Sequence, residues 1–222
     1  MRKPGLVLTV ASGLFIAFAI ALPWGLRWYL GSHLPTLSAI PVEEVAAIEV
    51  SGTEIPIGDL RFVLPEGTSP ELDDSRKRPH WSIQIGARNL KMFTPTFWKT
   101  WDPTIGICCE DPRNTPYVEQ LRQVYSVSSD PGWLRMRSAE FNRYSKRIRC
   151  AYFYRSPSAT RLMILSRPGY HVCVVDHEGR AADISVIEDD TQKIWGFMLI
   201  SPEKDTTRED LIDFASRIRL PR

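Results

Sequence analysis

Four cysteines are the residues of this sequence whose chemistry is easiest to anticipate. They are Cys108, Cys109, Cys150 and Cys173. Outside the cytoplasm cysteines form disulfides, and four of them allow three pairings. Adjacent cysteines rarely bond each other, but one of the pair in GICCEDP could bond Cys150 or Cys173. The sequence leaves open whether Cys150 and Cys173 form a cross-strand disulfide or are two small core residues.

Neither redox catalysis nor metal binding is indicated by the cysteine spacing. The C-x-x-C motif of thiol redox enzymes does not occur in the sequence, and no histidine lies near the adjacent cysteines. We therefore expect structural disulfides or inert thiols, with no metal and no cofactor. A thiol-dependent assembly factor that uses Cys108 or Cys109 is an alternative.

His171, Asp176 and His177 supply the residue types of acid–base catalysis. However, the stretch DHEG at 176–179 is typical of a solvated hairpin turn, and the spacing of the two histidines matches no metal-ligand pattern. The sequence also lacks G-x-S-x-G, G-x-x-x-x-G-K-[ST], H-E-x-x-H and G-x-G-x-x-G. These absences favour a protein without catalytic activity, and the alternative is an exported hydrolase whose site is assembled from separate loops.

The segment from Trp133 to Arg155 combines basic and aromatic residues with one acid, Glu140. One interpretation is an amphipathic helix with aromatic residues in the core and arginines in solvent. The other is a surface on which guanidinium groups pair with phosphate or carboxylate groups. The candidate partner-binding residues are Arg135, Arg137, Arg143, Lys146, Arg147 and Arg149. Outside the cytoplasm the partner would be another envelope protein or an anionic surface, and not a nucleic acid.

An uncharged run near the N-terminus indicates the compartment in which the domain and its candidate site residues lie. Residues 4–26 carry no charge, and at about 1.5 Å per residue such a helix crosses a hydrocarbon core of about 30 Å. Arg2 and Lys3 precede the run, so the N-terminus is expected in the cytoplasm and the domain outside the inner membrane. The alternative is a signal peptide cleaved at Ala21, because AIA offers the small residues that a peptidase requires.

The elements that would position the candidate residues make up an α+β fold. We expect an N-terminal transmembrane helix or signal peptide at 1–30, a linker at 31–47, and one domain at 48–222 with a mostly antiparallel sheet flanked by helices. Helices are predicted at 115–125, with Thr115 as the cap, at 133–146, and at the C-terminus behind a Thr206–Glu209 capping box. Strands are predicted at 60–65, 81–87, 148–154, 170–176, 181–188 and 193–200, and residues 159–166 could be a strand or a short helix.

Two stretches at the ends of this domain carry a resemblance to a known family. RFVLPEG near its start, the antiparallel meander, and the terminal DLIDFASRIRL together resemble the Mog1/PsbP-like α/β/α sandwich. The resemblance implies a small exported protein that binds or helps to assemble other proteins without catalysis. Thr68 stands where such proteins often carry an aromatic residue after LP-x-G, and no functional residue is carried over.

Overall fold

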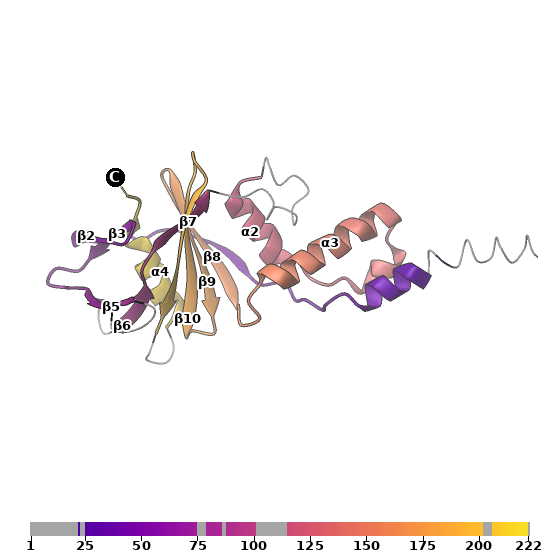
Figure 1. Cartoon of the computed structure of the whole chain (residues 1–222), viewed down its shortest axis with the longest axis horizontal. Helices are drawn as coiled ribbons and strands as arrows, with labels where there is room; N and C mark the ends of the chain where they lie inside the picture. Colours follow the sequence, from indigo (N-terminus) through magenta and orange to yellow (C-terminus); the bar gives the residue numbers. More distant parts are fainter. Residues whose placement is uncertain are drawn as a thin grey trace, which may run out of the picture.

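A large sheet is the centre of the fold (Figure 1). The computed structural model describes residues 22, 25–74, 79–85, 88–100, 115–201 and 206–221. In spatial order the sheet contains β1 (Val42–Val45), β8 (Arg161–Arg167), β9 (Tyr170–His177), β10 (Ala181–Glu188), β11 (Lys193–Ile200), β6 (Arg88–Phe93), β5 (His80–Ile85) and β4 (Glu71–Asp73), and β7 (Thr96–Thr100) also pairs with β11. Only the β1–β8 pairing is parallel among these strands. The predicted α+β class with a mostly antiparallel sheet is therefore confirmed.

One face of the large sheet is covered by a small sheet and a helix. The small sheet contains β2 (Thr53–Ile57), β3 (Leu60–Leu64) and β12 (Ile218–Arg219), and the helix is α4 (Arg208–Ser216). Phe62 lies at the centre of this core, with its ring centroid 6.0 Å from that of Phe197 and 5.9 Å from that of Phe214. Burial of these aromatic side chains, together with the aliphatic residues around them, stabilises this face.

The start of α4 differs by one residue from the prediction. The side chain of Thr207 accepts a hydrogen bond from the Asp210 backbone N–H, and the Asp210 carboxylate accepts one from the Thr207 N–H. The predicted capping box of Thr206 and Glu209 is thus wrong. Both pairs fit the same threonine-x-x-acid spacing. The helix starts at the later pair, Thr207 and Asp210, and this start turns Leu211, Phe214 and Ala215 toward the sheet.

The other face of the sheet is covered by α2 (Tyr117–Ser126). Val118, Val124 and Tyr125 of this helix belong to a second core together with Cys173 and Val175 of β9. The predicted helix at 115–125 is confirmed, although Pro116 occupies the N-cap and makes no side-chain cap.

A long helix, α3 (Ser138–Tyr154), extends away from the sheet behind a short 3-10 turn, η2 (Pro131–Arg135) (Figure 1). Its 17 residues span about 25 Å. The strand predicted at 148–154 is wrong, because this stretch is the second half of α3. Its aromatic and β-branched residues suit a strand, but Phe141, Ile148 and Ala151 are buried at helical spacing and decide the conformation.

The structure also describes parts of the predicted linker, of the ambiguous stretch 159–166 and of the N-terminal run. β1 lies inside the stretch 31–47, where a linker is predicted, and the ambiguous stretch 159–166 belongs to a strand, β8. Residues 25–32 are helical, whereas most of the uncharged run at 4–26 lies outside the described residues. In the part of the chain that the structure describes, no helix has the length and apolar character needed to cross a bilayer.

Candidate functional site

The basic candidates lie on the outer surface of η2 and α3. Arg135 ends η2 and Arg137 immediately precedes α3. The α3 basic face consists of Arg143, Lys146, Arg147 and Arg149, all exposed. Residues three and four positions apart on a helix are neighbours, so these side chains form one continuous surface. The structure therefore brings four of the six sequence-predicted residues together, with the other two near the start of the helix.

Among the described residues, no acid pairs with Lys146, Arg147 or Arg149 of this face. Glu140 is the acid of the segment, and its Oε2 atom accepts a hydrogen bond of 2.7 Å from the backbone N–H of Arg137. That bond satisfies one of the unpaired N–H groups at the helix start. Within the described ranges, Lys146, Arg147 and Arg149 form no ion pair, so their charges face solvent.

A groove of about 560 Å³ runs along one side of the α3 basic face. Its lining residues are Ser126, Val127, Ser128, Met136, Glu140, Arg143, Tyr144 and Arg147. Ser126 is the last residue of α2, Val127 and Ser128 follow it, and the remaining residues come from α3 or the segment just before it. The Tyr144 hydroxyl is already engaged, since it accepts a hydrogen bond of 2.9 Å from the Asp130 backbone N–H. We call this hollow the α3 groove.

Arg155 fixes the wall of the α3 groove relative to α3. Its buried guanidinium donates hydrogen bonds of 2.6–2.8 Å to the carbonyl oxygens of Val124, Tyr125, Val127 and Ser38. The carbonyl groups at the end of α2 lack helical partners and carry partial negative charge, which suits a cation. Burial lowers the pKa of Arg155 from its very high ordinary value, and the group remains charged at neutral pH.

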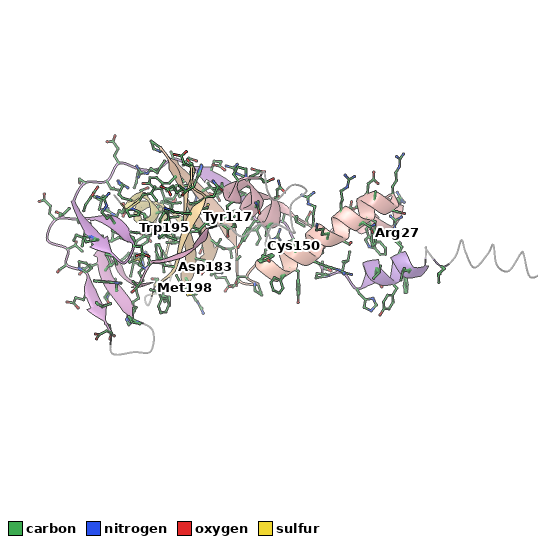
Figure 2. The ribbon with its side chains drawn as sticks, turned by 45° about the horizontal axis from the view of Figure 1, so that its top comes forward. Arg27, Tyr117, Cys150, Asp183, Trp195 and Met198 are labelled. Carbon is green, nitrogen blue, oxygen red and sulfur yellow. The ribbon has the colours of Figure 1, made fainter. Side chains whose placement is uncertain are left out.

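The helix at residues 25–32 is docked onto the far end of α3. Arg27 Nη2 donates to the carbonyl oxygens of Trp133, at 2.8 Å, and of Met136. Its guanidinium also lies 5.0 Å from the ring centroid of Phe141. Gly31 lies so close to Trp133 that an added Cβ atom would come within 2.2 Å of the indole ring. Figure 2 shows Arg27 at the end of α3 that is remote from the sheet.

Exposed apolar side chains collect around this docked helix. Leu26, Trp28 and Tyr29 are each more than half exposed, and Leu134 of η2 is 40% exposed. Large exposed apolar side chains of this kind mark interaction sites when they gather at one place. The end of the molecule that carries residues 25–32 therefore combines aromatic and aliphatic side chains with the basic residues of η2 and α3.

The cysteines occupy different elements. Cys150 lies in α3, where the helix reaches the sheet domain (Figure 2), and it is disulfide-bonded. Cys173 of β9 is a free, buried thiol, so these two cysteines are not bonded to each other. Burial raises the pKa of Cys173 to about 12. Cys108 and Cys109 lie outside the described residues.

The histidine cluster is split between the two ends of β9. His177 Nε2 lies 2.8 Å from Asp183 Oδ2, and its Nδ1 lies 3.0 Å from Ser158 Oγ. The Asp176 carboxylate does not contact His177 in this way. It accepts a hydrogen bond of 3.0 Å from the Gly179 N–H in the predicted hairpin turn. His171 lies about 20 Å along the strand from His177.

Sequence reasoning missed Ser158 and Asp183. The β9–β10 register brings Asp183 close to His177, and the β8–β9 register does so for Ser158, which lies just before β8. His171 instead contacts Asp189, with 3.2 Å between Nε2 and Oδ1. Among the residues that the structure describes, no group of histidine, cysteine and acidic side chains could hold a metal ion.

Comparison of the chain with protein-family models, with curated proteins and with solved structures finds no match. The resemblance to the Mog1/PsbP-like sandwich stays a prediction. A function must therefore be inferred from the geometry of α3, the docked helix and the sheet domain.

Proposed function

We propose that this protein is a single-pass, membrane-anchored accessory protein that holds its α+β domain outside the cytoplasm and binds another envelope component without catalysis. The docking of residues 25–32 onto η2 and α3 carries the proposal. This helix begins in the last two residues of the uncharged run, so an anchored chain would leave the bilayer at the end of the molecule where the basic residues lie.

The side chains around the docked helix support this orientation. Trp28 and Tyr29 are exposed there, and aromatic side chains favour the headgroup layer of a membrane. In the proposed orientation α3 acts as a spacer of about 25 Å, with the buried Arg155 clamping its other end to α2. The sheet domain would then stand clear of the lipid and be accessible to a partner.

The α3 basic face is the proposed contact surface. It offers guanidinium groups with rigid, forked hydrogen-bond donors, which suit carboxylate and phosphate groups. Its position on a helix stabilised at both ends means that little backbone conformational entropy is lost on binding. An acidic face of an envelope protein or an anionic surface has the matching charge.

The exported-hydrolase alternative draws on one specific observation, the chain Ser158–His177–Asp183. A nucleophilic serine also requires a substrate cleft and donors for the developing oxyanion. The α3 groove and the hollows beside Trp195 and Gly31 are not lined by these three residues. A surface hydrogen-bond chain at a hairpin turn is the simpler interpretation.

Cross-linking in intact cells followed by mass spectrometry tests the proposal. We expect cross-links to membrane or envelope proteins, and we expect the double variant Arg143→Glu and Arg147→Glu to lose them. The matched control is Arg180→Glu and Lys193→Glu, which reverses two exposed charges on the sheet domain. Cross-links to cytoplasmic proteins, or equal capture by both double variants, would argue against the proposal.

A further inference from the structure

One side of α3 carries exposed residues along most of its length. Asn142, Lys146, Arg149 and Phe153 follow one another at intervals of four, three and four residues, and all four are exposed. At 3.6 residues per turn they lie within about 60° of one another around the helix axis, on the side that faces away from the buried residues of the helix. We call this row of side chains the α3 ridge, and it spans about 17 Å.

The two cations of the α3 ridge have no acidic partner in the part of the chain that the structure describes. Glu140, the acid of the segment, accepts the backbone N–H of Arg137 and projects from a different side of the helix. Lys146 and Arg149 are three positions apart and therefore neighbours on the helix surface, so their like charges repel each other. A carboxylate bound at each of them would offset this repulsion.

Exposed aromatic side chains end the α3 ridge. Phe153 is 78% exposed, and Tyr152 beside it is 65% exposed. The Phe153 ring meets the Tyr154 ring edge-on, with 5.1 Å between the ring centroids. Aromatic residues and arginine are enriched at the centres of protein–protein interfaces, and Arg149 lies one helical turn before Phe153. The ridge therefore combines an apolar anchor with two unpaired cations.

The position of Phe153 favours a protein partner over a lipid surface. In the proposed orientation the bilayer lies at the end of α3 near Arg27 (Figure 2), and Phe153 lies at the other end. About 24 Å of helix separates Arg137 from Phe153, which is about three Debye lengths at physiological ionic strength. Lipid headgroups would attract the cations next to Phe153 only weakly and could not bury its ring.

We propose that the α3 ridge binds an acidic segment of another envelope protein, with carboxylates on Lys146 and Arg149 and an apolar side chain against Phe153. The Arg149 guanidinium donates two parallel hydrogen bonds to one carboxylate, and the Lys146 ammonium donates to the second. The apolar contact at Phe153 excludes water from the neighbouring ion pair and so strengthens it. This proposal rests on the proposed function, because it names the partner chemistry of the contact surface on α3.

Photo-cross-linking from the α3 ridge in intact cells tests the proposal. Phe153 of the full chain is replaced by p-benzoylphenylalanine, which keeps an aromatic ring there, and the cross-linked peptide is sequenced by mass spectrometry. We expect one segment of an envelope protein, with a pair of acidic residues beside the cross-link. Lys146→Glu with Arg149→Glu should lower the cross-linking yield about tenfold, because like charges then face each other. The control, Arg180→Glu with Lys193→Glu, reverses two exposed charges on the sheet domain and should leave the yield unchanged.

A charge swap in the identified partner completes the test. Lysines in place of its paired carboxylates should restore cross-linking to Lys146→Glu with Arg149→Glu and weaken cross-linking to the wild-type ridge. Cross-links to phospholipid, cross-links to a segment without acidic residues, or equal yields in both double variants would overturn the ridge as the site. An exported, membrane-bound chain that gives no cross-link from position 153 refutes the ridge alone, whereas a chain found in the cytoplasm refutes the proposed function.

Discussion

The Nη2 atom of Arg27 donates a hydrogen bond of 2.8 Å to the carbonyl oxygen of Trp133, a residue 106 positions later in the chain. This bond joins the segment after the uncharged run to the turn that precedes α3. Because the Phe141 ring lies beneath the same guanidinium, the contact combines a charge-assisted hydrogen bond with a cation–π interaction. The position of residues 25–32 against η2 and α3 depends on this contact.

Substitution of Gly31 tests the docking of residues 25–32. A Cβ atom at Gly31 would overlap the indole ring of Trp133, so Gly31→Ala is expected to displace the helix and increase hydrogen exchange in 131–137. Gly25→Ala is the matched control, because no described atom lies within 4 Å of its added Cβ and it makes the same change of residue type in the same helix. Unchanged protection of 131–137 in Gly31→Ala would contradict the docking.

Arg155 should be the most sensitive residue of the junction between α3 and the sheet domain. Replacing it with methionine leaves carbonyl oxygens of the α2 end without their donor, and we expect a loss of about 3 kcal/mol in the free energy of unfolding. Arg149→Met on the exposed side of α3 is the control, with an expected change of less than about 0.5 kcal/mol. Urea unfolding followed by circular dichroism measures both, and equal midpoints would refute the clamp.

The strands of the meander were predicted well from local sequence patterns. Successive side chains of these strands point alternately into the two cores, so apolar residues are frequent at both sets of positions. Residues 170–176, 181–188 and 193–200 are confirmed as strands β9, β10 and β11, with short polar turns between them. The stretch 148–154 was predicted wrongly because its composition suits a strand, and only the burial of Ile148 and Ala151 shows the helical period. Tertiary packing outweighs strand propensity when the two favour different conformations.

Contacts between residues far apart in the sequence could not be predicted from local patterns. For example, β1 has two glutamates among its four residues and pairs in parallel with β8. The α3 groove forms between residues 126–128 and α3, and Arg155 sets their distance through carbonyl groups of α2. A basic segment was visible in the sequence, whereas its groove, its wall and its neighbour at residues 25–32 required the fold.

Alkaline pH should destabilise the fold through Tyr125 and Cys173. Burial is the main cause that raises the pKa of each of these groups to about 12, whereas the unfolded chain loses the same protons near pH 10 and 8.5 respectively. Their contribution to stability is full below about pH 8.5 and is lost as the pH rises toward about 12.

The phenol contribution can be isolated with Tyr125→Phe. Between about pH 8 and about pH 10.5, this variant should lose about 1 kcal/mol less stability than the wild type in urea unfolding. Tyr152→Phe removes a phenol that is 65% exposed and serves as the control. A wild-type slope in Tyr125→Phe would show that the buried phenol does not contribute.

The chain Ser158–His177–Asp183 should be catalytically inert. Ser158 is exposed, and it does not line the α3 groove or the hollows beside Trp195 and Gly31 that the described residues form. A fluorophosphonate probe is therefore expected to label it no faster in the native protein than in the unfolded chain. Rapid native labelling of Ser158 that disappears in His177→Gln would favour the hydrolase alternative and contradict a purely structural role.

Protease treatment of intact cells, combined with fractionation of the full chain, is the most direct test of the anchored orientation. We expect the whole chain to remain in the membrane pellet after a high-salt and alkaline wash, and protease added outside the inner membrane to remove the α+β domain. A full-length chain that is recovered in the soluble cytoplasmic fraction and resists external protease would contradict the anchored, extracytoplasmic orientation.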